Sequence, residues 1–301
     1  MTRVLVTGAS GFIGRRTVAA LLDQGFEVDA VARHAPSGAP EAVRWHEADL
    51  LDRGARTALV AGAQATHLLH LAWYAEPGRY WSSTANTRWV SATADLIERF
   101  AAQGGARAVV AGTCAEYEWG QAAPCTEGVT PLRPVSLYGI CKDATRRIAE
   151  GLAAQLEVSL AWGRIFFVYG PGEHPSRLVA SVARALVAGE RAAIGDGTQR
   201  RDFMHVDDVA RALSALLAGD VQGAVNVGSG EAVAIDEVAR LIAAAAGGEH
   251  LLDVGALPER SGQPASVVAH PGRLREEIGF APSIPLETGV ADTVRWWRER
   301  R

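Results

Sequence analysis

The sequence lacks an excess of basic residues and lacks long apolar runs, and both absences narrow the class of protein. Lysine and arginine number 30 against 34 acidic residues, so we expect no nucleic-acid partner. No apolar stretch approaches the roughly 20 residues that span a bilayer, so we expect no membrane association. The first residues lead directly into a predicted strand, so we expect no signal peptide and a cytoplasmic protein.

Cysteine is also scarce. The three cysteines, Cys114, Cys125 and Cys141, are an odd number and show none of the spacings of a metal site. We interpret them as free thiols in a reducing compartment, and we expect no metal. The remaining composition, with 48% hydrophobic and 21% charged residues, is that of a globular protein.

Short β-branched runs alternate with longer amphipathic segments, the pattern of a parallel sheet connected by helices. Runs such as Val-Leu-Val-Thr are apolar at every position, as expected for strands buried on both faces. We therefore predict an α/β fold with a Rossmann-like, doubly wound parallel sheet. The predicted strands are 4–7, 27–32, 43–46, 66–72, 108–112 and 158–164, and the predicted helices are 12–24, 86–103 and 136–155.

The regular alternation weakens after residue 164, where clusters of glycine and proline appear. We predict that residues 1–164 form an NAD(P)-binding Rossmann domain. Residues 165–301 are expected to form mainly a smaller C-terminal α/β substrate-binding region, with some elements returning to the first domain. The helices predicted in this part are 175–188, 207–217, 235–246 and 287–298.

A glycine-rich turn follows the first predicted strand and opens the first predicted helix. Gly8, Gly11 and Gly14 have the spacing G-x-x-G-x-x-G, which lets the backbone turn tightly and approach a pyrophosphate. The helix that begins at Phe12 and Ile13 offers unpaired N–H groups to the same anion. We predict that these five residues bind a nicotinamide dinucleotide.

The end of the second strand bears on the choice of cofactor. An acid there would bind the adenosine ribose of NAD, but this chain has Ala32 followed by Arg33. Arg33 could bind a 2′-phosphate, with help from Arg15 or Arg16, which favours NADP(H) over NAD(H). The alternative is that Arg33 is a solvated loop cation. Asp49-Leu50, after the third strand, has the position of an adenine contact.

Tyr138 and Lys142 are four residues apart on a predicted helix, so their side chains share one face. A neighbouring ammonium lowers the pKa of a phenol and suits it for proton transfer. Thr113 ends the fifth strand, at the ligand edge of a parallel sheet. We predict that Thr113, Tyr138 and Lys142 form a catalytic set, in which Lys142 also binds the cofactor.

Together these motifs resemble the extended short-chain dehydrogenases/reductases of the NAD(P)-dependent nucleotide-sugar epimerase/dehydratase family. The motifs that carry the resemblance are Thr7 to Gly14, Thr113, Tyr138 with Lys142, Tyr169-Gly170-Pro171-Gly172 and Arg201 to Asp208. The resemblance implies a catalytic Ser/Thr-Tyr-Lys set, a cofactor contact at Leu71-Ala72, and binding of the sugar nucleotide diphosphate by Arg201 and Arg260. It also implies a homodimer.

The chain departs from the family pattern at three places. Sugar 4,6-dehydratases carry Thr-Asp-Glu where this chain has Thr113-Cys114-Ala115, so we do not expect dehydratase chemistry. Phe166-Phe167-Val168 replaces a stretch that often holds a substrate-binding asparagine. The aromatic stretch 73–81 is either a lid over the substrate or part of the core.

We therefore expect an NADP(H)-dependent oxidoreductase that acts on a nucleoside-diphosphate sugar. The first hypothesis is reduction of a 4-keto-6-deoxysugar at C4. The alternative is a 4-epimerase that oxidises C4 transiently on a retained cofactor. A third hypothesis, from another class, is a non-catalytic NADP-binding sensor, which would have been expected to lose Tyr138 or Lys142.

Overall fold

The computed structural model describes residues 2–38, 40–120, 123–258 and 262–301. A central sheet of seven parallel strands has the order β11-β6-β5-β4-β1-β2-β3. Because all strands run parallel, their carboxyl ends lie at one edge of the sheet. The strand order progresses in one direction from β1 to β3 and in the opposite direction from β4 to β11, so the topological switch point lies between β1 and β4. The strands are β1 (Arg3–Thr7), β2 (Glu27–Ala32), β3 (Val43–Glu47), β4 (His67–His70), β5 (Arg107–Thr113), β6 (Ser159–Ile165) and β11 (Gly223–Val227).

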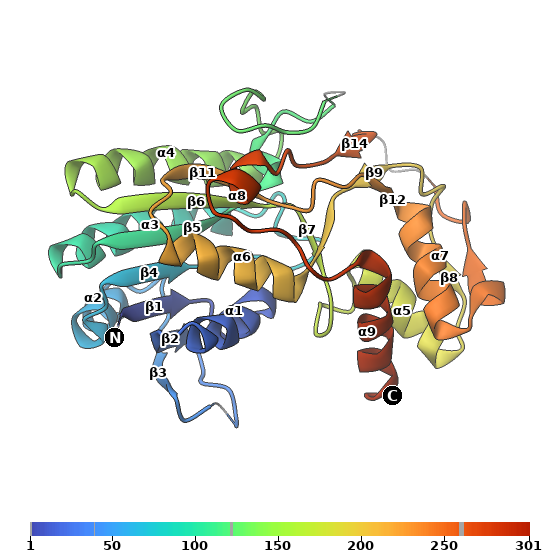
Figure 1. The fold of residues 1–301 in the computed structure, drawn as a ribbon, viewed down its shortest axis with the longest axis horizontal. Helices are drawn as coiled ribbons and strands as arrows, with labels where there is room; N and C mark the ends of the chain where they lie inside the picture. Colours follow the sequence, from blue (N-terminus) through green and yellow to red (C-terminus); the bar gives the residue numbers. More distant parts are fainter. Residues whose placement is uncertain (1, 39, 121–122, 259–261) are drawn as a thin grey trace.

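Helices cover both faces of the sheet (Figure 1). In β1, Val4 and Val6 pack on one face with residues of α1 and α6, whereas Leu5 packs on the other with residues of α2, α3 and α4. Apolar residues are therefore needed at all three central positions of β1. The helices are α1 (Phe12–Asp23), α2 (Arg53–Ala63), α3 (Ala85–Ala102), α4 (Leu137–Gln155) and α6 (Val206–Ala218).

The C-terminal part has a core of its own, formed mainly by three helices at the right of Figure 1, α5 (Leu178–Ala188), α7 (Ile235–Ala246) and α9 (Leu286–Arg298). Small sheets connect this core to the rest. The remaining elements are β7 (Phe167–Tyr169), β8 (Ala192–Ala193), β9 (Arg200–Arg201), β10 (Phe203–His205), β12 (Val233–Ala234), β13 (Leu252–Asp253), β14 (Ser266–Val267), α8 (Gly272–Glu276) and the 3₁₀ turns η1 (Cys114–Glu116) and η2 (Glu249–Leu251).

The predicted fold class is confirmed. The predicted fourth strand, 66–72, ends earlier than expected, at His70, because the next residues leave the sheet and approach the turn at Gly8. The sequence analysis did not identify α2 or β11. β11 is short and acquires its hydrogen bonds only by pairing with β6, which lies more than 50 residues earlier in the chain.

His70 connects the first strand to helix α3. Its Nδ1 lies 2.7 Å from the Thr7 hydroxyl and its Nε2 lies 2.9 Å from the Thr93 hydroxyl. The Thr7 hydroxyl also accepts from the Ala72 amide at 3.3 Å, so both ring nitrogens of His70 have a hydroxyl partner and Thr7 connects the ring to residue 72. Complete burial lowers the pKa of His70 to about 3, because the charged ring would lose its hydration. His70 is therefore neutral in the fold and holds the loop at residue 72 against the turn.

This predicts a specific loss of stability in acid. The unfolded chain takes up a proton at His70 below about pH 6.5, whereas the folded chain does not until about pH 3. Stability from this residue is therefore complete above pH 6.5 and falls by about 1.4 kcal/mol per pH unit below it. Urea unfolding of His70→Gln between pH 4.5 and 7.5 should give a shallower pH dependence than the wild type. Equal slopes would contradict the assignment.

Candidate active site

The glycine-rich turn has the geometry that the sequence predicts. Gly8 has φ +69°, and a Cβ there would lie 2.8 Å from the Ala72 amide nitrogen. A Cβ at Gly14 would lie 2.1 Å from the carbonyl oxygen of Gly8. Gly11 is the N-cap of α1 and offers no side chain to the first amides of the helix. The open helix N-terminus, which starts at Phe12 and Ile13, therefore fits an anionic pyrophosphate.

Arg33 follows the end of β2 and is exposed, without a hydrogen bond or ion pair to any described residue. Arg15 and Arg16 instead donate to the carbonyl oxygens of Gly172 and Pro171. The suggestion that they assist Arg33 therefore gains no support, because the turn after β7 occupies their guanidinium groups. After β3, Leu50 is buried and the neighbouring Asp49 is exposed.

The predicted catalytic residues lie together at the carboxyl end of β5. Thr113 is the last residue of that strand, and its hydroxyl is close enough to the phenol of Tyr138 to favour the phenolate. Tyr138 lies in the first turn of α4, which begins where the Ser136 side chain accepts from the Gly139 amide. Burial raises the pKa of Tyr138, and the Thr113 hydrogen bond opposes that rise. Tyr138 is therefore protonated in the absence of other ligands.

Lys142 is buried one helical turn beyond Tyr138. Its Nζ donates to the Ala111 carbonyl at 2.9 Å and lies 3.9 Å from the centre of the Trp73 ring. Burial lowers the pKa of Lys142 to about 7, and the negative charge of Glu116 opposes this. The ammonium thus has few partners in this structure, and its direct effect on the phenol of Tyr138 stays a prediction.

Aromatic rings surround Tyr138. Tyr80 packs edge-on at 4.9 Å between ring centres, and Trp81 at 5.8 Å. Trp119 contacts Trp81 and donates its indole N–H to the Cys114 carbonyl at 2.9 Å. Tyr80 is buried, whereas Trp81 keeps 38% of its surface exposed. The aromatic stretch therefore contributes both to the core and to the surface beside Tyr138.

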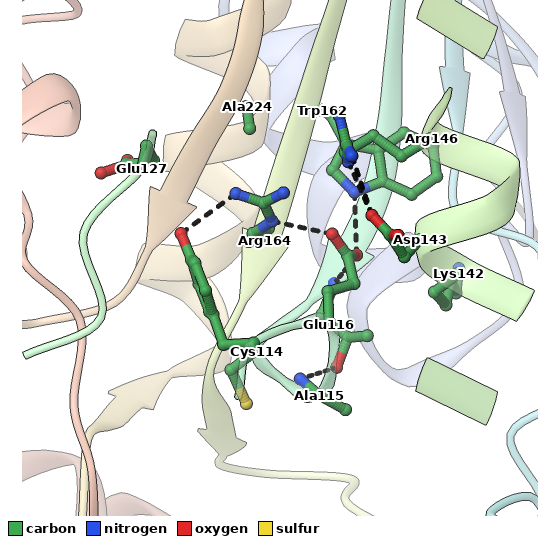
Figure 2. Close-up of polar contacts among 12 residues, drawn as sticks. Cys114, Ala115, Glu116, Glu127, Lys142, Asp143, Arg146, Trp162, Arg164 and Ala224 are labelled. Carbon is green, nitrogen blue, oxygen red and sulfur yellow. Dashed lines mark hydrogen bonds and ion pairs between the residues drawn. The ribbon is translucent and has the colours of Figure 1, made fainter. Parts of the chain in front are cut away.

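Glu116, which the sequence analysis did not single out, is fully buried and hydrogen bonded to the backbone of Thr113. Figure 2 shows its side chain beside Trp162 and Arg164. It accepts hydrogen bonds from the Thr113 amide, from the indole of Trp162 and from Arg164. The signal that could have revealed it is the spacing Thr-x-x-Glu, which is typical of a capping box at a helical turn. Position 115, where a dehydratase would have its glutamate, is a buried alanine.

Arg201 is buried where β9 passes near the end of β5. Its guanidinium donates to the carbonyl oxygens of Arg200 and Pro264 and lies 5.5 Å from the Phe167 ring. Within the described ranges no carboxylate lies within ion-pair distance of it, and burial lowers its pKa. A buried cation with neutral partners is suited to bind an anion. Arg260 lies outside the described residues.

No cluster of three or more histidine, cysteine or acidic side chains in the described part of the chain could hold a metal ion. No described helix has both the length and the hydropathy required to cross a membrane.

A Rossmann sheet with a glycine-rich turn and a Thr-Tyr-Lys set at its carboxyl edge defines an extended short-chain dehydrogenase/reductase. The sequence model of the NAD dependent epimerase/dehydratase family matches residues 4–228. The chain belongs to this family. Its relatives include nucleotide-sugar epimerases and dehydratases.

Three relatives illustrate the similarity. A dTDP-glucose 4,6-dehydratase of Streptomyces griseus is 29% identical, over 100% of this chain and 95% of the relative. The UDP-glucose 4-epimerase of Thermus thermophilus in complex with NAD is 28% identical, with a TM-score of 0.88 and coverage of 99% of both chains. MoeE5 in complex with UDP-glucuronic acid and NAD is 34% identical, with a TM-score of 0.85 and coverage of 99% of this chain and 100% of that protein.

The arrangement predicts that the hydroxyl of Tyr138 carries the proton transfer. Tyr138→Phe should reduce kcat by about 10²- to 10⁴-fold, because only the hydroxyl is lost and the ring still packs on Tyr80. Cofactor affinity should not change, whereas Lys142→Met should lower both turnover and cofactor affinity. Steady-state kinetics and cofactor titration measure both effects.

Tyr169→Phe is a matched control. Its buried hydroxyl donates to the Leu286 carbonyl, away from Thr113 and Lys142, so the variant should keep its turnover. A Tyr138→Phe enzyme with wild-type kcat would rule out the proton-transfer role and revive the non-catalytic hypothesis.

Proposed function

We propose that the protein oxidises and re-reduces C4 of a nucleoside-diphosphate sugar, as a 4-epimerase. The observation that carries the proposal is the assembled set of Thr113, Tyr138 and Lys142 without a carboxyl side chain at Cys114 or Ala115. This set can move a proton and a hydride at one carbon, but it lacks the acid and base required for elimination of water from the sugar. Dehydration is therefore not proposed.

In this mechanism Tyr138 removes the proton of the C4 hydroxyl and later returns it. Thr113 binds the same oxygen, and Lys142 favours the phenolate and binds the nicotinamide ribose. A bound dinucleotide would supply the hydride acceptor and donor, and inversion requires that the opposite face of the 4-keto sugar receive the hydride. Gly8, Gly11 and the open N-terminus of α1 would hold its pyrophosphate.

The substrate lies, in this proposal, between residues 1–164, which hold the cofactor, and residues 165–301. Arg201 binds the diphosphate, because it is buried and its described partners are neutral groups. Arg260 is proposed as the second diphosphate ligand on the family resemblance alone. An incoming diphosphate would exchange the carbonyl contacts of Arg201 for charge-assisted hydrogen bonds.

The cofactor proposed for the epimerase is retained NAD, since the T. thermophilus epimerase and MoeE5 were solved with NAD. One observation favours the second candidate, an NADPH-dependent 4-ketoreductase of a 4-keto-6-deoxysugar. Arg33 is exposed and unpaired among the described residues, and Ala32 replaces the acid that would bind the ribose of NAD. Arg33 is therefore free to bind a 2′-phosphate.

Product analysis separates the two candidates. The purified protein should release NAD(H) on denaturation, and should invert C4 of UDP-glucose, UDP-glucuronic acid or a dTDP-hexose without added cofactor. NMR of the product and chromatography of the released nucleotide measure these outcomes. Turnover that consumes one NADPH for each 4-keto sugar would support the reductase instead. If the protein did neither, the proposed function would be wrong.

A paired substitution tests the diphosphate site with the same assay. Arg201→Ala should raise KM by about ten- to a hundredfold, because a charge-assisted contact contributes about 1.5–3 kcal/mol. Arg200→Ala is the matched control, since Arg200 is the neighbouring, exposed arginine. Loss of cofactor binding in Arg201→Ala would indicate that Arg201 contacts the cofactor, and would contradict its assignment to the substrate diphosphate.

We also propose a homodimer, which the family resemblance implies. Helix α4 presents Ile140 and Ile148 to solvent with 48% and 42% of their surfaces exposed, two turns apart on one face. Burying that face against a second copy would remove apolar surface from water. Sedimentation velocity should give twice the monomer mass for the wild type and a lighter species for Ile148→Asp. A monomeric wild type would contradict this.

A further inference from the structure

Glu116 occupies the catalytic segment but is not available to a substrate. Its side chain is fully buried, and both carboxylate oxygens accept hydrogen bonds. Oε1 accepts from the Thr113 amide and from Trp162 Nε1, each at 2.9 Å, and Oε2 accepts from Arg164 Nε at 2.7 Å. Figure 2 shows the carboxylate held between Trp162 and Arg164. It therefore does not replace the acid that the segment lacks at Cys114 and Ala115.

The contact with Thr113 constrains that residue at two points. The Thr113 amide donates to Glu116, and the Thr113 hydroxyl oxygen accepts from the Ala115 amide at 3.2 Å. Such a reciprocal box fixes both the backbone and the rotamer of its first residue. The packing is tight, because a Cβ at Gly112 would lie 2.8 Å from Glu116 Oε1 and 2.1 Å from Trp162 Nε1.

Arg164 anchors the carboxylate from the neighbouring strand. It lies on β6 opposite Gly112, and its guanidinium also donates to the Tyr117 hydroxyl at 3.1 Å. Tyr117 in turn donates to Asn226 on β11 at 2.8 Å. Buried ion pairs of this kind often add nothing to stability compared with apolar residues of similar size. Stability alone therefore does not account for the pair.

We propose that Glu116, held by Arg164, is a positioning residue that fixes Thr113 for its contact with the reacting oxygen. The proposal depends on the proposed function only for the role of Thr113, which is to bind the reacting oxygen. Glu116 itself touches neither substrate nor cofactor. A displacement of about 1 Å at a reacting group can cost about a hundredfold in rate, so fixing the strand end matters for turnover.

Two double variants separate positioning from folding. Glu116→Met with Arg164→Met replaces the ion pair by apolar groups and removes the acceptor of the Thr113 amide. Glu116→Gln with Arg164→Gln removes both charges but keeps an oxygen for that amide. Asp29→Asn is the control, because Asp29 is a buried carboxylate on β2 paired with Arg44 on β3 at 2.6 Å, away from β5 in the sheet order.

The methionine variant should fold and lose about 10- to 100-fold in kcat, with substrate KM and cofactor affinity within about threefold of the wild type. The glutamine variant should recover kcat to within about fivefold, because it keeps the hydrogen bond to Thr113. Asp29→Asn should change kcat by less than about twofold. A folded methionine variant with wild-type kcat, or a glutamine variant as slow as the methionine variant, would overturn the proposal.

A second readout needs no substrate. Hydrogen exchange of the Thr113 amide, followed by NMR, should be slow in the wild type and in the glutamine variant. In the methionine variant the exchange should be faster by about tenfold or more, because the amide has lost its acceptor. If the wild type turns over no nucleotide sugar, the proposed function fails while this measurement still decides whether Glu116 holds Thr113. Equal exchange in all three proteins would overturn the positioning role, and so would rapid exchange in the glutamine variant.

Discussion

The buried pair of Glu116 and Arg164 is the interaction on which the catalytic edge of the sheet depends. It joins the end of β5 to β6, and the hydroxyl of Tyr117 extends the connection to Asn226 on β11. A buried carboxylate is tolerated only when its charge and its lone pairs are satisfied, and here three donors satisfy it. The strand end that carries Thr113 therefore has one defined position.

The nucleotide half of the site depends on a second buried network. His70 is neutral and joins Thr7 to Thr93, and Thr7 accepts from the Ala72 amide. This brings residue 72 against Gly8, where no side chain would fit. The two networks lie at the carboxyl ends of β4 and β5, which are neighbouring strands of the sheet. A strand end and helix α4, rather than loops, thus position Thr113, Tyr138 and Lys142.

The proposed chemistry follows from the side chains that the carboxyl edge of the sheet contains, and from the carboxyl groups that are missing at Cys114 and Ala115. The hydroxyl of Thr113, the phenol of Tyr138 and the buried ammonium of Lys142 suit transfer of a proton and a hydride at one carbon. The acid nearest to Thr113 in sequence, Glu116, is directed toward Trp162 and Arg164 of β6. Under the proposed function this distinguishes the chain from a dehydratase, although the sequence identity to a dehydratase and to an epimerase is similar, at 29% and 28%.

The sequence by itself determined the parallel sheet, the glycine-rich turn and the candidates Thr113, Tyr138 and Lys142, because each is encoded by local periodicity, by spacing within an element or by its place at the end of a strand. It did not reveal β11, the partners of His70 or the role of Glu116. Those depend on contacts between residues 20 to more than 100 positions apart, such as Tyr117 with Asn226. Local patterns carry no information on such pairs, so only the tertiary structure decided that Glu116 faces Arg164 rather than a substrate.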